Sequence, residues 1–129
     1  MFLGIEIGGT KLQLAVGAGD GVLAAIERLP VDAAGGARGI LEQIESTGRR
    51  LVGEHGVTGV GFGFGGPVDP VQGRVVKSHQ VEGWDDFPLV QWCSDQLGRP
   101  AVLGNDCDAA ALAEARFGAG RGRGSVFFV

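Results

Sequence analysis

The segment 101–114 constrains the fold more than any other part of the chain. A short apolar run at 101–103 ends in Gly-Asn-Asp-Cys-Asp, and an alanine-rich stretch follows at once. This pattern is typical of a buried strand that passes directly into a helix in an open α/β sheet. Ligands bind such sheets at the carboxyl ends of the strands. Asn105 and Asp106 are therefore candidates for a binding or catalytic site.

Two roles are open to Asp106. Its side chain could cap the helix, because Asp and Asn are preferred at that position, and this segment alone favours the cap. It could instead be the general base of a phosphotransferase, which accepts a proton from a substrate hydroxyl. The two roles are compatible, since a carboxylate at the start of a helix can still face a substrate.

The rest of the chain predicts the elements of one α/β domain. The length of 129 residues suits a single core. Glycine-rich turns separate alternating apolar runs at the start, which predicts an antiparallel meander, and helical periodicity alternates with apolar runs afterwards. Strands are expected over 2–7, 12–16, 22–29, 57–64, 101–103 and 125–129, and helices over 37–54, 86–97 and from the Asn-Asp pair to 117.

This order predicts a mixed five-stranded sheet of the ribonuclease H-like class, with a three-strand meander, two parallel strands and flanking helices. The apolar strand 57–64 is expected to be buried on both faces. The apolar residues 125–129 have no evident partner in the sequence. We therefore expect residues 1–118 to form one lobe, with 119–129 crossing into a second lobe. Alone, the last strand would pair edge to edge with another copy, which favours a homo-oligomer.

The composition of the chain indicates which kinds of partner and which cellular compartment to expect. Glycine makes up 25 of the 129 residues, far above the usual ~7%, and its spread among apolar runs indicates tight turns and close backbone approaches. The net charge of −4 gives no support to nucleic-acid binding. Cys93 and Cys107 have neither metal-ligand nor disulfide spacing, which suits a reducing compartment. No apolar run approaches the ~18 residues of a membrane span. We expect a cytoplasmic protein with no membrane or nucleic-acid partner.

Two glycine loops could bind a ligand. Gly8-Gly9-Thr10-Lys11 lies between the first two strands, where backbone N–H groups, a hydroxyl and a positive charge could contact a phosphate. A simple hairpin turn would look the same, and the segment is not a Walker A motif. Gly65-Gly66-Pro67 lies past the end of a strand, where a ligand role is favoured.

The polar loop 78–86 could carry substrate contacts, because loops carry function more often than cores do. Its candidates are His79 and Gln80. A lone histidine in a loop is more often solvated than functional, and Trp84 more often anchors such a loop on the core.

Three motifs occur in a fixed order: Gly-Ile-Glu-Ile-Gly-Gly-Thr-Lys at 4–11, Gly-Phe-Gly-Phe-Gly-Gly-Pro-Val-Asp at 61–69, and Gly-Asn-Asp-Cys-Asp-Ala-Ala-Ala at 104–111. Together they closely resemble the amino-terminal half of the ROK family, which contains bacterial glucokinases, fructokinases, N-acetylhexosamine kinases and sugar-responsive repressors. The resemblance covers essentially the whole chain. It implies a lobe of an actin-like ATPase fold that acts with ATP and Mg²⁺ on a hexose.

The resemblance also implies roles for individual residues. Asp106 would be the catalytic base. Sugar contacts would come from Gly66, His79, Gln80 and Asn105, and phosphate contacts from Glu6, Gly8, Gly9, Thr10 and Lys11. The chain departs from the family pattern at three places: Glu6 replaces a usual Asp, Gly65 replaces a usual Pro, and Ser-His-Gln at 78–80 stands where Ser-Pro-Asn is common.

The second lobe of the family carries another phosphate loop, the adenosine pocket, a further sugar-binding Glu and a zinc-binding Cys/His cluster, none of which is in this sequence. The 129 residues alone are therefore expected to lack kinase activity, because catalysis in this fold needs two lobes to close. Two other functions stay open. A sugar-responsive repressor would need a helix-turn-helix domain before the first strand, and because Met1 lies directly against that strand we do not expect one unless the chain has been trimmed at its start. The third possibility is a non-catalytic sugar-binding or assembly lobe.

Overall fold

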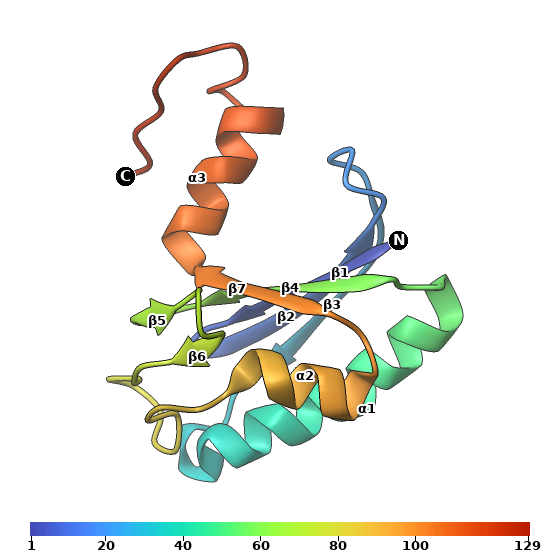
Figure 1. Ribbon diagram of the computed structural model, residues 1–129, viewed down its shortest axis with the longest axis vertical. Helices are drawn as coiled ribbons and strands as arrows, with labels where there is room; N and C mark the ends of the chain where they lie inside the picture. The colour runs from blue at the N-terminus through green and yellow to red at the C-terminus, as the bar shows by residue number, and fades with distance from the viewer.

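The computed structural model describes all 129 residues, and its main feature is a mixed five-stranded sheet (Figure 1). The strand order is β3-β2-β1-β4-β7. The first three strands form the predicted antiparallel meander, and β4 and β7 add in parallel. The bounds are β1 Phe2–Ile7, β2 Lys11–Gly17, β3 Leu23–Pro30, β4 Gly59–Phe64 and β7 Ala101–Asn105. The predicted sheet is confirmed.

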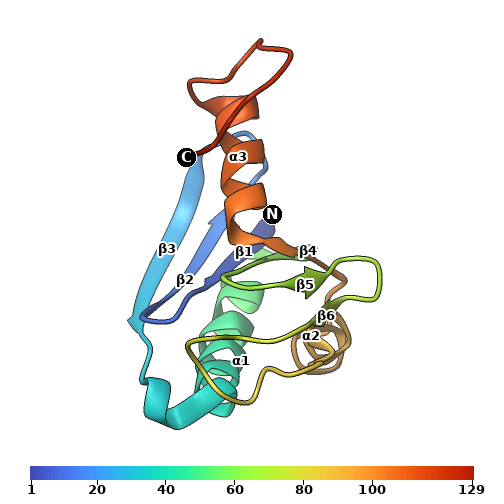
Figure 2. The same cartoon turned by 90° about the vertical axis from the view of Figure 1, so that its left-hand side faces the viewer.

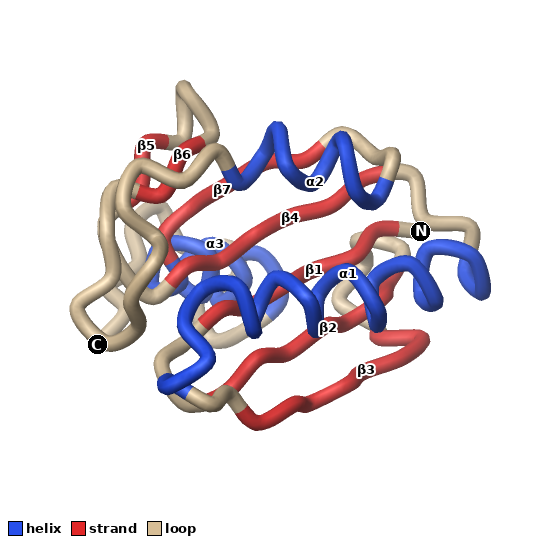
Figure 3. The backbone as a smooth tube through the Cα atoms, turned by 90° about the horizontal axis from the view of Figure 1, so that it is seen from below, coloured by secondary structure: helices blue, strands red, loops and turns tan.

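Two helices cover one face of this sheet. Seen from below, α1 (Gly36–His55) lies over β1 and β2 and α2 (Leu89–Leu97) lies over β7, both on the near face of the sheet (Figure 3). Each helix ends at a glycine in the left-handed region, Gly56 with φ 60° and Gly98 with φ 62°, a conformation that glycine adopts without strain. A short 3-10 turn, η1 (Ala33–Gly35), precedes α1, and a small two-stranded ribbon of β5 (Val68–Asp69) and β6 (Arg74–Val75) lies beside the sheet.

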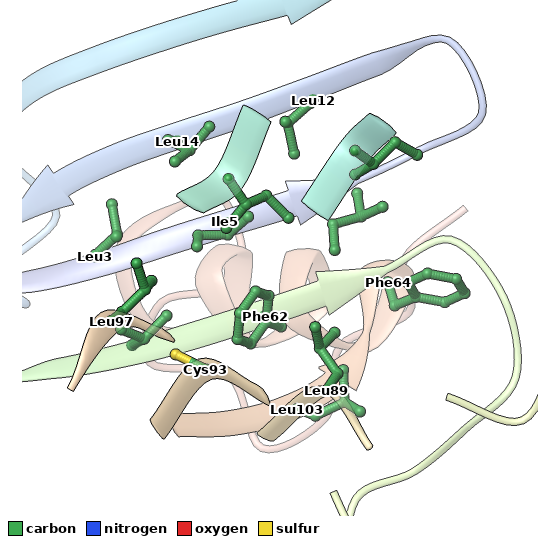
Figure 4. Packing of buried hydrophobic residues seen from close by; sticks show 14 of the residues in the cluster. Leu3, Ile5, Leu12, Leu14, Phe62, Phe64, Leu89, Cys93, Leu97 and Leu103 are labelled. Carbon is green, nitrogen blue, oxygen red and sulfur yellow. The ribbon is translucent and has the colours of Figure 1, made fainter. Parts of the chain in front are cut away.

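The hydrophobic core lies between the sheet and these two helices (Figure 4). Alternate residues of each strand point into it, as period-2 patterning requires. The strands contribute Leu3, Ile5, Ile7, Leu12, Leu14, Val16, Val60, Phe62, Phe64 and Leu103, and the helices contribute Ala37, Ile40, Ile44, Leu51, Val52, Leu89, Cys93 and Leu97.

The opposite face of the sheet is largely open, so the expectation that strand 57–64 is buried on both faces is wrong. α3 (Asp106–Phe117) stands over this face and has no buried residue (Figure 2). Several of the strand residues that face it are small or polar, among them Gly4, Glu6, Gly61 and Gly63. Val102 is 72% exposed there. Glycines at alternate positions keep this face flat, which lets the first turns of α3 approach the backbone.

The strand expected over 125–129 does not form. These residues run as irregular chain after α3 and pair with no strand. The edge-to-edge pairing that favoured a homo-oligomer therefore has no support from this segment. None of the three α-helices combines the length and the apolarity that a membrane span requires.

Candidate active site

The three sequence motifs meet at one edge of the sheet. β1, β4 and β7 are parallel neighbours, and their last residues lie in register, Ile7 opposite Phe64 and Phe64 opposite Asn105. The segments that leave these strands therefore start side by side. The Gly65 amide donates to the Ile7 carbonyl at 2.9 Å and so joins two of them. This is the carboxyl edge of the parallel strands, where the sequence predicted a site.

Asp106 is the first residue of α3, and its carboxylate faces the glycine segments. Oδ2 lies 3.4 Å from where a Cβ on Gly65 would be, and Gly65 in turn borders the Cα of Gly8. Oδ1 accepts from the Cys107 amide at 2.8 Å. Asp106 is thus one of the two acidic residues in the first turn of α3, where negative charge interacts favourably with the helix dipole.

Asn105, rather than Asp106, is the N-cap of α3. Its Oδ1 accepts from the Cys107 amide at 3.0 Å. Its Nδ2 donates to the Gly66 carbonyl at 3.1 Å and to the Phe64 carbonyl at 3.4 Å. One carboxamide thus ties the start of α3 to the segment that follows β4, and it leaves Oδ2 of Asp106 free for a substrate.

Gly66 occupies a place with no room for a side chain. A Cβ there would lie 2.9 Å from the Lys77 carbonyl oxygen and 3.0 Å from the Phe64 ring. The segment can therefore pass close to residue 77 only because residue 66 is glycine. This brings the loop that begins at Ser78 next to the end of β4.

The turn Gly8–Lys11 is a closed hairpin, with the Gly8 amide donating to the Lys11 carbonyl at 3.0 Å. Thr10 and Lys11 are exposed at its tip, and Gly9 is half-buried. The turn therefore offers a hydroxyl and a positive charge beside a glycine backbone, the groups that suit an anion.

Glu6 lies on the open face of β1 and contacts its strand neighbours. Its Oε2 accepts from Nε2 of Gln13 at 2.8 Å, and Oε1 of Gln13 accepts from Nε of Arg28 at 2.8 Å. Glu6 and Asp106 line the same hollow, of about 680 Å³, between this face and α3. The position of Glu6 in the first motif identified it as a candidate site residue, but the sequence did not predict its hydrogen bond with Gln13.

The loop 78–83 is held at both ends. Oγ of Ser78 accepts from the amides of Gln80 and Val81 at 3.2 and 3.1 Å. Trp84 is 1% exposed and packs edge-on against Phe64 at 5.1 Å and against Phe87 at 5.5 Å between ring centroids. The predicted anchoring role of Trp84 is thus confirmed.

The two sequence candidates on this loop are placed differently. The side chain of Gln80 reaches the turn Gly8–Lys11, where it lies against Gly9. His79 is exposed and has no side-chain hydrogen bond. The structure therefore brings Gln80 to the glycine turn and leaves His79 at the surface. No group of three or more His, Cys, Asp or Glu side chains is arranged to hold a metal ion.

Comparison with known proteins identifies the family. The model of the ROK family matches residues 2–129. The chain belongs to the ROK family. It is 29% identical over 127 residues to a glucokinase of Streptomyces coelicolor, covering 98% of this chain and 39% of that protein. It is 29% identical over 134 residues to a putative fructokinase of Bacillus subtilis, covering 100% and 42%.

The fold of this ROK chain is that of solved sugar kinases. A crystal structure of a ROK family glucokinase from Streptomyces griseus in complex with glucose and AMPPNP superimposes with a TM-score of 0.85 and 32% identity, over 94% of this chain and 38% of that one. The fold is therefore that of an actin-like ATPase lobe, as expected. The chain spans about two fifths of the length of the relatives that it matches.

The two thiols of this ROK chain differ in their surroundings. The negative charge of Asp106 raises the pKa of the exposed Cys107, and burial raises the pKa of Cys93 to about 11. Because the thiolate is the reactive form and must also be accessible, the exposed Cys107 is expected to react with iodoacetamide faster than the buried Cys93 at any given pH.

Asp106→Asn is expected to move the midpoint of the Cys107 alkylation profile to lower pH, because a neutral neighbour no longer opposes the thiolate. Alkylation rates measured from pH 6 to 10 check this. Asp108→Asn should give a smaller shift in the same direction, since Asp108 contributes least to the raised pKa. An unchanged midpoint in Asp106→Asn would show that the carboxylate does not face this thiol.

Proposed function

We propose that this chain is the amino-terminal lobe of an ATP-dependent kinase that phosphorylates a hydroxyl of a glucose-like hexose. The observation that carries the proposal is the placement of Asp106, whose free Oδ2 faces Gly65 and the glycine turn at Gly8. The family supports it, because the relatives named above include a glucokinase and a putative fructokinase, and one solved relative holds glucose and AMPPNP.

In this mechanism Asp106 accepts the proton of the sugar hydroxyl as that oxygen attacks the γ-phosphorus of ATP. The bond between the γ-phosphorus and the bridging oxygen breaks, and ADP leaves. The turn Gly8–Lys11 binds the transferring phosphate through backbone N–H groups and the side chains of Thr10 and Lys11. The sugar is oriented by Asn105, Gly66 and Gln80, and His79 has no assigned role in this mechanism because it lies at the surface.

Mg²⁺ fits this proposal through Glu6. The ion is usually bound by one or two carboxylates together with substrate phosphates, and Glu6 lines the same hollow as Asp106. When bound, Mg²⁺ neutralises phosphate charge. Glu6 would face the ion directly or through water, held in place by Gln13.

The rest of the active site is assigned to a second lobe. We propose that residues 1–118 form the first lobe and that 119–129 cross to the second, in a cytoplasmic protein. The 129 residues alone should not hydrolyse ATP in a sugar-dependent way, because closure of two lobes completes the site. Sugar-dependent ATP turnover by the purified 129-residue chain would contradict this.

The function itself is tested on the full-length protein with a panel of hexoses. Formation of ADP and of the sugar phosphate is measured with Mg²⁺ and ATP, and turnover with glucose or a close relative is expected. A full-length protein that binds sugar but transfers no phosphate to any hexose would instead be a sugar-responsive regulator or a non-catalytic sugar-binding protein.

A further inference from the structure

Gln80 connects two parts of the candidate site that lie far apart in the sequence, the loop 78–83 and the turn Gly8–Lys11. It lies on the loop 78–83, whereas Gly9 lies in the hairpin turn between β1 and β2, some seventy residues earlier in the chain. The Oε1 atom of Gln80 occupies the place that a Cβ on Gly9 would take, and the Cδ atom lies 2.6 Å from that place. The carboxamide therefore rests directly on the Gly9 backbone.

This contact depends on the identity of both residues. Even the Cβ of Gln80 is only 3.1 Å from the Cβ position of Gly9, so any side chain at residue 9 would displace the glutamine. Asn, which is shorter by one methylene, would hold its carboxamide further from Gly9.

The loop that carries Gln80 is anchored at both of its ends. Ser78 fixes the backbone of the loop with two hydrogen bonds, and the buried Trp84 fixes its far end. The glycine turn is closed by its own hydrogen bond between Gly8 and Lys11. The turn Gly8–Lys11 and the loop 78–83 contact each other through the side chain of Gln80. A displacement of the turn therefore also displaces the loop.

We propose that Gln80 is a positioning residue that couples occupancy of the phosphate turn to the affinity of the sugar loop. This inference rests on the proposed function and deepens it. A phosphate on Gly8–Lys11 fixes the Gly9 backbone, and the Gln80 carboxamide resting on it fixes the loop in its sugar-binding position. By linkage, sugar raises nucleotide affinity by the same factor.

The test measures glucose binding to the full-length protein by calorimetry, with and without saturating AMPPNP. The wild type is expected to bind glucose at least about 5-fold more tightly when AMPPNP is bound, which is the low end of ordinary coupling between sites. Gln80→Ala and Gly9→Ala should each reduce this factor to below about 2-fold. The double variant should lose no more than either single one, because both changes remove the same contact.

Glu82→Ala is the matched control, since Glu82 is an exposed residue of the same loop with no side-chain hydrogen bond, and its coupling factor should equal that of the wild type. Full coupling in Gln80→Ala, or a wild type that binds both ligands without coupling, would overturn the inference and leave the proposed function intact. A wild type that binds neither glucose nor AMPPNP would overturn both.

Discussion

Asp106→Asn in the full-length protein is expected to lower kcat by roughly 10²- to 10⁴-fold, the usual contribution of a general base, and to leave the hexose KM within a few-fold. The amide that replaces the carboxylate keeps its size but cannot accept the hydroxyl proton. Asn105 still caps α3 through the Cys107 amide, so the helix should form unchanged. Steady-state kinetics with the preferred hexose and ATP measure the two constants.

Asp108→Asn provides the control for charge. Both residues lie in the first turn of α3 and line the same hollow, but Asp106 and not Asp108 is among the nearest neighbours of Gly65. Its kcat should stay within about 2-fold of the wild type. A comparable loss of kcat and of sugar affinity in Asp106→Asn would instead assign a structural role to this carboxylate.

Trp84→Ala is expected to lower the free energy of unfolding by about 3–5 kcal/mol, the usual cost of removing a large buried aromatic side chain. Trp84 is fully buried, and it packs edge-on against both Phe64 and Phe87. Its removal leaves a cavity at the base of the loop 78–83 and ends two aromatic contacts. Urea unfolding followed by far-UV circular dichroism measures the change.

Trp84→Phe is the control for this prediction. It keeps an aromatic ring between the two neighbours and should cost less than half as much as the alanine variant. A loss below about 1 kcal/mol in Trp84→Ala would show that the loop collapses to fill the cavity, and that the tryptophan is not its anchor.

Much of the fold could be predicted because its signals are local. A short apolar run predicted β1, alternating apolar residues predicted β2, and helical periodicity predicted α1 and α2. The convergence of the three motifs also followed from the sequence, since the carboxyl ends of parallel strands share one edge.

What the sequence did not predict depends on contacts between distant residues. The period-2 pattern of β4 does not reveal which helices cover its faces, so the open face was missed. Both Asn105 and Asp106 are good N-caps by type, and the residue at which the helix begins decides between them: Asn105 has extended backbone and Asp106 is already helical. The reach of Gln80 to Gly9 joins residues far apart in the chain, and no spacing rule encodes it.

The absence of buried side chains in α3 affects the hydrogen exchange of its backbone amides. None of its side chains is buried, whereas the strands beneath it fill the core. An element with few buried contacts opens locally at a lower free energy than the global unfolding of the domain. In this chain, α3 therefore opens while the five-stranded sheet stays intact, and each opening carries Asp106 away from Gly65. Amide exchange of α3 is therefore expected to be faster than that of the sheet, and a measured global stability would not report this local opening.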